Sequence, residues 1–265
     1  MFVARQAPRR TTGKTVLDKV FGVPISEQSI VQIARQLTAE PVPTNAGLRL
    51  VCTINLDHVV NLRRSARFRD AYAKAWMVTV DGTPVFLYAK MIGAHPIERV
   101  TGSDLFIQIL NLLPRRECRL FFVVSSHQTE AGIVRKLLSQ GFERDRVAFD
   151  IPEFGFEKSE AQSERLAQRI REFQPTHIFF GVGSPKSEVW LAERVDQLGD
   201  AYAFGFGAGL DFYAGTARRA PLVFRNLGLE WFWRFTLQPK RLFRRYFIDS
   251  RYFVGAVIDD WRSRH

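Results

Sequence analysis

Short apolar runs alternate with longer amphipathic stretches between about residues 48 and 207, and this alternation limits the possible folds more than any other feature. The apolar runs are rich in β-branched and aromatic residues, a composition that predicts buried strands. Their sequences are LRLVCTI, WMVTV, CRLFFVV, RVAFDI, THIFFGV and AYAFGFG. Because predicted helices separate the strands, the connections are typical of βαβ units. We therefore predict an α/β fold with a Rossmann-like, mostly parallel sheet and helices on both faces.

Basic charge is concentrated at the two ends of the chain, which has 265 residues and a formal net charge of +11. Residues 1–20 carry five Lys or Arg against one Asp, and residues 217–265 carry eleven against four acidic residues. The residues between are neutral overall, so binding of polyanions over the whole surface is not expected. We expect a basic mobile N-terminal tail over 1–20, an α/β catalytic core over 21–216, and a C-terminal appendage over 217–265.

The predicted appendage mixes arginines with Trp, Phe, Leu and Tyr at helical spacing, and Pro221 and Pro239 are placed to start helices. A merely solvated charged face would not carry so many aromatic residues. Nucleic-acid binding would require a recognisable motif, and none is visible. Interfacial membrane helices combine basic and aromatic faces in this way, and each basic residue contributes about 1 kcal/mol near anionic lipids. We therefore predict an amphipathic helical appendage that meets an anionic membrane surface.

Signals for a metal or a redox cofactor are weak. The two cysteines, Cys52 and Cys118, lie in predicted strands, as expected of reduced core thiols in a cytosolic protein. The five histidines are scattered and no Asp-x-Asp occurs, so no metal site is expected. TTGKT at 11–15 lacks the first glycine of a P-loop, and GVGSPK lacks the third glycine of a dinucleotide fingerprint. From the sequence we expect neither a secretory signal nor a membrane-spanning segment.

The stretch GVGSPKSE at 181–188 is a candidate anion site. It follows a predicted strand, and Ser184 could cap the next helix with Pro185 in its first turn. Free backbone N–H groups at a helix start favour an anion, and Lys186 would add a positive charge for a phosphate. The alternative is an ordinary strand–helix turn with a good cap, and the spacing alone does not separate the two.

Polar residues also follow two other predicted strands. Asp81 in VDG and the pair Thr53 and Asn55 in TINLDH lie where a parallel sheet presents its binding groups. Asp-Gly is also a common turn dipeptide, and Asn55 could simply cap a helix. His58 and His127 could act as bases, although single histidines near helix starts more often have structural roles.

Taken together, several motifs resemble those of the WecG/TagA/CpsF glycosyltransferases, in family order from about residue 20 to 250. They are T-x-N-x-x-H at 53–58, DG at 81–82, RVTGSDL at 99–105, PEFGF at 152–156, GSPKSE at 183–188, and GFGAGLDFYAGTARRAP followed by LGLEW and QPKRLFRRY. The resemblance implies an inverting, metal-independent transfer of a sugar from a UDP-sugar to a polyprenyl-diphosphate-linked saccharide. It implies no cofactor and a peripheral, cytoplasmic location on the inner face of a bacterial cell membrane.

The resemblance also implies roles for individual residues. Asp81 would be the general base that takes the proton of the acceptor hydroxyl. The substrate would contact Thr53, Asn55, Arg99 and Ser187. The nucleotide would be bound by Gly183, Ser184, Pro185, Lys186, Glu188, Gly207 and Asp211. The membrane or the acceptor diphosphate would meet Arg218, Arg219, Arg234, Arg241, Arg244 and Arg245.

Ser187 stands where the family usually has glutamine, so the resemblance does not fix the donor. UDP-ManNAc or UDP-ManNAcA and UDP-glucose or UDP-glucuronate remain alternatives. A different class, a non-catalytic membrane-bound binder of nucleotide sugars or nucleic acid, is disfavoured by the intact Asp81. We expect no nucleic-acid partner, and a homo-oligomer is left open.

Overall fold

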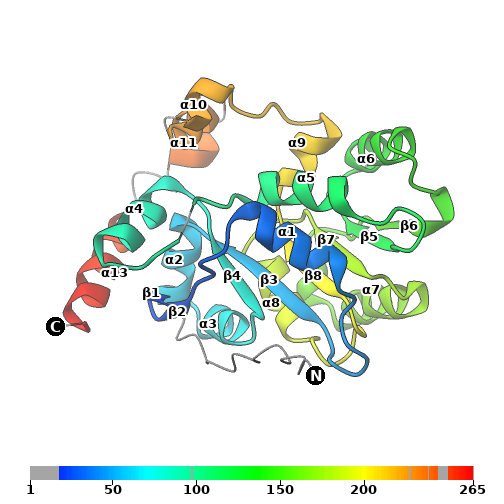
Figure 1. The fold of residues 1–265 in the computed structure, drawn as a ribbon, viewed down its shortest axis with the longest axis horizontal. Helices are drawn as coiled ribbons and strands as arrows, with labels where there is room; N and C mark the ends of the chain where they lie inside the picture. Colours follow the sequence, from blue (N-terminus) through cyan, green and yellow to red (C-terminus); the bar gives the residue numbers. More distant parts are fainter. Residues whose placement is uncertain (1–17, 97, 227, 238, 244–249, 265) are drawn as a thin grey trace, which may run out of the picture.

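A computed structural model describes residues 18–264 apart from 97, 227, 238 and 244–249 (Figure 1). The predicted tail thus lies largely outside the described residues. In the described part of the chain, six parallel strands form one sheet in the order β4-β3-β8-β7-β5-β6, which confirms the predicted parallel sheet. The strands are β3 (Arg49–Ile54), β4 (Met77–Val80), β5 (Leu120–Val123), β6 (Val147–Asp150), β7 (His177–Phe180) and β8 (Tyr202–Gly205). A small hairpin, β1 (Lys19–Val20) and β2 (Val23–Pro24), precedes them.

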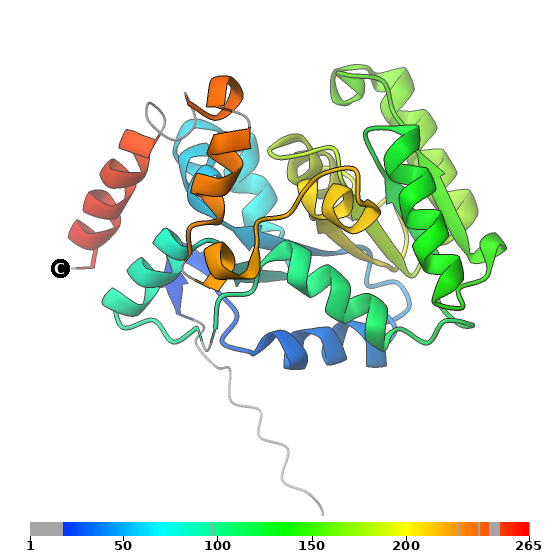
Figure 2. The same cartoon turned by 90° about the horizontal axis from the view of Figure 1, so that it is seen from above.

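Helices cover both faces of the sheet, and each face has its own apolar core. Figure 2 separates α1 and α5 on one side from α2 and α3 on the other. One core includes residues of α2 (Leu56–Arg64), α3 (Ala66–Ala73), α4 (Thr83–Met91), α7 (Glu160–Phe173) and α8 (Lys186–Ala192). The other includes residues of α1 (Ile30–Ala39), α5 (Gly102–Leu112), α6 (His127–Ser139) and α9 (Ala208–Ala214). Single 3-10 turns occur at Arg144–Arg146 and Phe156–Lys158.

Phenylalanine side chains of neighbouring strands stack on one another across the sheet. Phe122 stacks on Phe149 and Phe179, and Phe179 stacks on Phe204, with ring centroids 5.0 to 5.1 Å apart. Strands buried on both faces need apolar residues at nearly every position, which is why they form continuous runs in the sequence. The carboxyl ends of the parallel strands meet at one edge, and the loops beyond that edge form the site described below.

The described part of the C-terminal segment is mostly helical, as predicted. Its described helices are α10 (Leu222–Asn226), α11 (Glu230–Leu237), α12 (Pro239–Phe243) and α13 (Ser250–Arg262). The last helix packs on the core rather than standing apart from it, since Ala256 is buried and Asp259 pairs with Arg63 at 2.7 Å. Tyr88 donates a hydrogen bond of 2.8 Å to Asp260 of the same helix. The predicted appendage therefore divides into a surface part, α10 to α12, and a helix that belongs to the core.

Gly132 of α6 is expected to tolerate no side chain, because α9 crosses it closely. A Cβ at this position would lie 2.4 Å from the Ala214 carbonyl oxygen. Alanine normally stabilises a helix by about 1 kcal/mol over glycine, but forced overpacking costs about 1–3 kcal/mol. We expect Gly132→Ala to lower the free energy of unfolding, as measured in urea, while Arg135→Ala on the exposed face of α6 leaves it within about 0.5 kcal/mol. A stabilised Gly132→Ala would mean that α6 and α9 do not approach this closely.

Candidate active site

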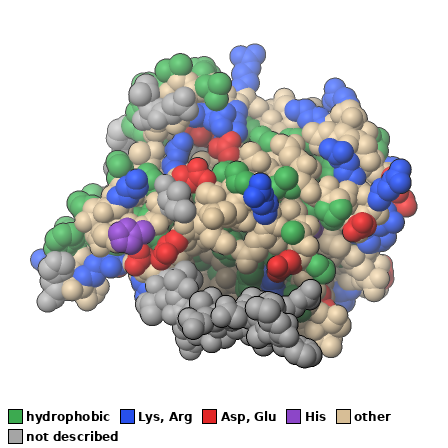
Figure 3. Space-filling view, in the orientation of Figure 1, with side chains coloured by type: hydrophobic (Ala, Val, Ile, Leu, Met, Phe, Trp, Pro, Cys, Tyr) green, Lys and Arg blue, Asp and Glu red, His purple; other side chains and the backbone are tan. Residues whose placement is uncertain are grey.

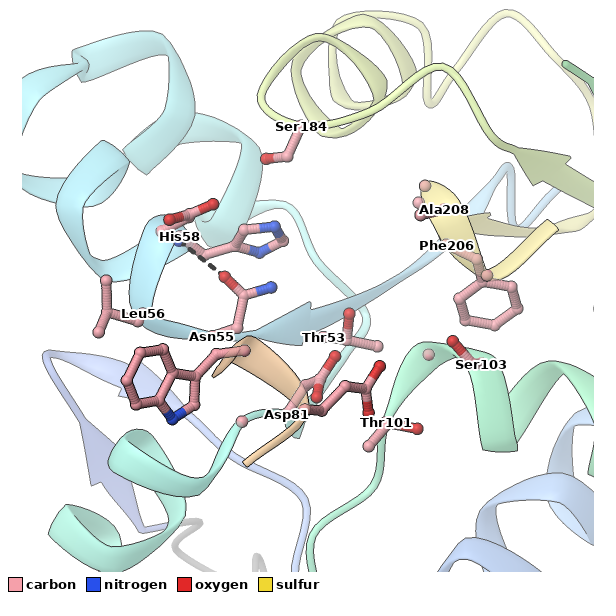
Figure 4. A pocket seen from close by; sticks show the side chains of 18 of the residues that line it. Thr53, Asn55, Leu56, His58, Asp81, Thr101, Ser103, Ser184, Phe206 and Ala208 are labelled. Atoms are coloured by element: carbon pink, nitrogen blue, oxygen red, sulfur yellow. Dashed lines mark hydrogen bonds between the residues drawn. The ribbon is translucent and has the colours of Figure 1, made fainter. Parts of the chain in front are cut away.

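A cleft of about 640 Å³ lies at the carboxyl ends of β3, β4, β7 and β8 (Figure 4). Its volume is in the range of small-molecule and cofactor sites. The cleft is lined by residues of four strand ends, of the turn that starts α5 and of the C-terminal segment. They are Thr53, Asn55, Leu56, Asp57, His58, Asp81, Gly82, Thr83, Pro84, Arg99, Thr101, Gly102, Ser103, Gly183, Ser184, Glu188, Gly205, Phe206, Gly207, Ala208, Gly209, Phe212, Gly228, Glu230 and Trp231.

Asp81 follows β4 and stands beside Thr53 in the cleft (Figure 4). Burial raises the pKa of its carboxyl from 3.8 to about 6, and the negative charge of Glu230 adds to this rise. Arg99 and the backbone N–H groups of Gly102 and Gly82 oppose it. The carboxyl is therefore ionised at neutral pH yet binds a proton more readily than an ordinary aspartate. This is the behaviour required of a general base.

Thr53 and Asn55 lie side by side with Asp81 because β3 and β4 are parallel neighbours. The strands pair Ile54 with Val80, and the Asp81 N–H donates to the Ile54 carbonyl at 2.8 Å. Asn55 caps α2, accepting a 3.1 Å hydrogen bond from the His58 backbone N–H (dashed in Figure 4), and also lines the cleft. The helix cap is thus confirmed, and the contact of Asn55 with substrate stays a prediction that its position in the cleft allows.

The stretch 181–188 contributes to the cleft differently from the prediction. α8 begins at Lys186, and its N-cap is Pro185, which has no side-chain hydrogen-bonding group. The assignment of Ser184 as a helix cap is therefore wrong; Ser184 is exposed and lines the cleft together with Gly183. Lys186 lies with its Nζ 5.3 Å from the ring of Phe154.

Ser187 is buried, and its hydroxyl donates a 3.0 Å hydrogen bond to the Gly183 carbonyl inside the turn. Within the described residues, the lining of the cleft does not include Pro185, Lys186 or Ser187. The side chain of Ser187 therefore bonds its own turn, and its expected contact with substrate stays a prediction.

The β8–α9 connection supplies Gly207, whose φ of +50° suits glycine, to the cleft lining. Asp211 lies one turn into α9 and accepts a 2.8 Å hydrogen bond from the Thr129 hydroxyl. It links α9 to α6, and the described lining of the cleft does not include it. The described residues of the loops after β5 and β6 are not part of that lining either. His127, a candidate base, pairs with Glu130 on the surface.

His58 has the structural role that its position suggested. It is 4% exposed, and burial lowers its pKa to about 3, so the ring is neutral. Its Nδ1 lies 2.6 Å from the Tyr72 hydroxyl, and its Nε2 lies 3.7 Å from Oε1 of Glu188. Glu188, on α8, lines the same cleft.

The C-terminal segment closes one side of the cleft with Gly228, Glu230 and Trp231. None of these three was predicted from the sequence to lie in the site. Arg225 holds this segment by a 2.7 Å ion pair with Asp104, while its carbonyl accepts a 3.1 Å hydrogen bond from Arg99. The motif LGLEW was a signal for these residues, but nothing in their spacing showed that they reach the strand ends.

The predicted arginines fall into three groups. Arg218 is exposed, whereas Arg219 pairs with Asp104 at 2.9 Å. Arg244, Arg245 and the side chains of Arg234 and Arg241 lie outside the described residues.

Both cysteines are buried, unpaired thiols in the described part of the chain. Within the same residues, no three His, Cys, Asp or Glu side chains are grouped so that they could hold a metal ion. None of the described helices is both long and apolar enough to cross a membrane.

A parallel sheet with a cleft at the carboxyl ends of its central strands, and a half-buried carboxylate beside uncharged hydrogen-bonding groups, is typical of an α/β enzyme that binds a polar ligand. The chain belongs to the WecG/TagA/CpsF family of glycosyl transferases, which it matches over residues 18–265. It is similar to a protein of Staphylococcus aureus (strain NCTC 8325 / PS 47), with 23% identity over 85% of this chain and 86% of that protein. A protein of Bacillus spizizenii is 25% identical over 89% of both chains. Each is named N-acetylglucosaminyldiphosphoundecaprenol N-acetyl-beta-D-mannosaminyltransferase. The chain is thus a glycosyltransferase.

Proposed function

We propose that this glycosyltransferase moves a sugar from a UDP-sugar to a polyprenyl-diphosphate-linked saccharide, with inversion and without a metal ion, in the assembly of a bacterial surface polysaccharide. The observation that carries the proposal is Asp81, an ionised carboxylate with a raised pKa in a cleft lined by hydroxyl, amide and backbone groups. The names of the two relatives support a lipid-linked acceptor, because both describe a saccharide carried on a diphosphoundecaprenol.

In this reaction Asp81 takes the proton of the acceptor hydroxyl as that oxygen attacks the anomeric carbon of the donor. The bond between that carbon and the diphosphate breaks, and UDP leaves with the negative charge. A single displacement of this kind inverts the anomeric carbon. Thr53 and Asn55 offer uncharged hydrogen-bonding groups for sugar hydroxyls beside the base. The diphosphate would lie near Gly183, Ser184 and Gly207, with Lys186 on the neighbouring turn, where cationic and N–H groups stabilise the leaving group.

The donor is of the UDP-ManNAc or UDP-ManNAcA type, or of the UDP-glucose or UDP-glucuronate type. Incubation with a panel of these donors and a prenyl-diphosphate-linked acceptor, with UDP release as the readout, tests the proposal. We expect turnover with one donor that requires the acceptor. A protein that binds UDP but turns over no donor with several acceptors would favour the non-catalytic alternative, and affinity for DNA that falls steeply with salt would favour a nucleic-acid binder.

The surface part of the C-terminal segment supports a peripheral location on the inner face of the cell membrane. Figure 3 shows apolar and basic side chains together over α10 and α11. Leu222 and Val223 are each 66% exposed, and Phe232 is 44% exposed. Large exposed apolar side chains beside basic residues match an anionic lipid surface better than water.

Replacing two of these side chains by charge is expected to weaken binding to vesicles. Leu222→Glu with Val223→Glu removes apolar area and adds negative charge, so the fraction that sediments with phosphatidylglycerol vesicles should fall about tenfold or more. Leu138→Glu is the matched control, because Leu138 is 44% exposed on α6, outside the C-terminal segment. Equal binding of both variants and the unchanged protein would contradict the membrane proposal. The test uses substitutions and not a truncation, because removal of residues 217–265 would also remove α13, which packs on the core.

A further inference from the structure

The residues just before α11 approach the start of α4 very closely. Thr83, two residues after Asp81, donates a 3.5 Å hydrogen bond from its hydroxyl to the Gly228 carbonyl. A Cβ on Gly228 would lie 2.4 Å from Oγ1 of Thr83, and the φ of this glycine is +72°. Glycine is therefore the residue that permits this approach. Glu230 follows two residues later, at the start of α11, and lines the cleft together with Asp81.

Two side chains of the core hold the segment before α11 in this place. Arg99 donates from Nη1 to the Thr83 hydroxyl at 3.3 Å and from Nη2 to the Arg225 carbonyl at 3.1 Å. Asp104, on α5, pairs with Arg225 at 2.7 Å and with Arg219 at 2.9 Å. The start of α11 is thus anchored to α4 and α5, the two helices that begin at the cleft.

This arrangement places two acidic side chains in one half-buried cleft, Asp81 from the end of β4 and Glu230 from α11. Like charges disfavour each other's ionised form, and the effect is screened less inside a cleft than in open water. After burial, the negative charge of Glu230 is the next cause that raises the pKa of Asp81 to about 6. Glu230 therefore acts on the carboxyl to which the proposed reaction gives the central task.

We propose that Glu230 is a positioning residue for the general base: its carboxylate, carried to the cleft by the C-terminal segment, makes Asp81 a stronger proton acceptor. The inference rests on the proposed function, because it takes Asp81 as the base, and it adds the residue that sets the strength of that base. Protonation of Asp81 relieves its repulsion from Glu230, so the proton of the acceptor hydroxyl is taken with a larger driving force. At neutral pH the base is still ionised.

Other charged and titratable groups also face Asp81. The Arg99 guanidinium acts on it through its charge and opposes Glu230, as do the backbone N–H groups of Gly82 and Gly102. Among the described residues, further titratable groups that line the cleft or interact with Asp81 are Asp57, His58, Tyr72 and Glu188. All of them remain when only Glu230 is changed, so comparison of the unchanged protein with Glu230→Gln isolates the effect of its charge.

The first test is the pH profile of kcat/KM for Glu230→Gln, which keeps the size of the side chain and removes its charge. We expect the acid limb of the profile to move to lower pH and the plateau to fall roughly threefold, because a weaker base is a less efficient one. KM for donor and acceptor should stay within about twofold. Glu230→Asp keeps the charge and should restore most of the profile.

A matched control removes a carboxylate of the same C-terminal segment far from the cleft lining. Asp259→Asn serves for this, because its 62% exposed side chain pairs with Arg63 on the surface, and it should leave the profile unchanged. Gly228→Ala tests the close approach itself. A methyl group at this position moves the start of α11 away from Thr83, so the acid limb should move in the same direction as in Glu230→Gln although both carboxyls are present.

The second test measures the titration of Asp81 directly and needs no turnover. The carboxyl carbon of Asp81, labelled with ¹³C and assigned by its loss in Asp81→Asn, is followed by NMR across the pH range. The midpoint should be lower in Glu230→Gln than in the unchanged protein. An equal or higher midpoint would overturn the inference, and so would a raised acceptor KM with an unmoved acid limb, which would make Glu230 a substrate ligand. Failure of the proposed function is a separate result, in which the unchanged protein turns over no donor whatever the midpoint of Asp81.

Discussion

Asp81→Asn is expected to lower kcat by about 10²- to 10⁴-fold, the usual contribution of a positioned general base. The amide has the size of the carboxyl but cannot take a proton from the acceptor hydroxyl. Binding of UDP should stay within about threefold, because the backbone positions around residue 81 are set by the pairing of β3 with β4. Single-turnover release of UDP at saturating donor and acceptor measures the chemical step directly.

The pH profile of the unchanged enzyme provides a second readout for the same residue. The pKa of Asp81 is about 6, so kcat/KM should fall as the pH drops below about 6 and the base becomes protonated. Asp70→Asn is the matched control, because Asp70 is exposed on α3, and it should leave both the rate and the profile unchanged. If Asp81→Asn keeps the turnover of the unchanged enzyme, Asp81 is not the general base, although the chain is still a glycosyltransferase.

The sheet could be predicted from the sequence because its signal is local. Each strand is a short run of β-branched or aromatic residues, and burial on both faces makes these runs apolar without alternation. Phe121, Phe122, Phe179 and Phe180 are all at most 1% exposed, which accounts for the paired phenylalanines of β5 and β7. Strand order was not predicted, because nothing in those runs specifies that β8 lies between β3 and β7.

The site could be predicted only where it follows a strand directly. Thr53, Asn55 and Asp81 were identified because parallel strands bring their carboxyl ends to one edge of the sheet. Glu230 was missed because it reaches the cleft through long-range contacts: the Arg99 guanidinium bonds the carbonyl of Arg225, 126 residues away. Ser184 was misassigned as a cap because the helix starts two residues later, at Lys186. Caps depend on local backbone geometry that residue type alone does not determine.

Two of the carboxyls that line the cleft, those of Asp81 and Glu188, have pKa values raised by burial. Such groups lower the stability of the protein when they are ionised. A carboxyl whose folded-state pKa exceeds its unfolded value is tolerated best when protonated. Its contribution to stability is fully present below the unfolded pKa and is lost as the pH rises through the folded pKa. Retention of such a group at neutral pH is the pattern expected of functional sites, where activity is selected at some cost in stability.

Glu188→Gln is therefore expected to stabilise the protein at high pH and to lose that advantage in acid. The pKa rises from 4.5 to about 7 on folding, so the ionised carboxyl costs the folded state about 3 kcal/mol at pH 8. Glutamine is neutral throughout and avoids this cost. The difference in unfolding free energy between variant and unchanged protein should be largest at pH 8, fall through pH 7 and level off near pH 4.5.

Urea unfolding at pH 5, 6, 7 and 8 measures this difference, with Glu193→Gln as the control, since its 41% exposed side chain pairs on the surface and should contribute less than about 1 kcal/mol at any pH. A stability difference that does not change with pH would contradict this expectation, because it would mean that the Glu188 carboxyl is solvated in the folded protein.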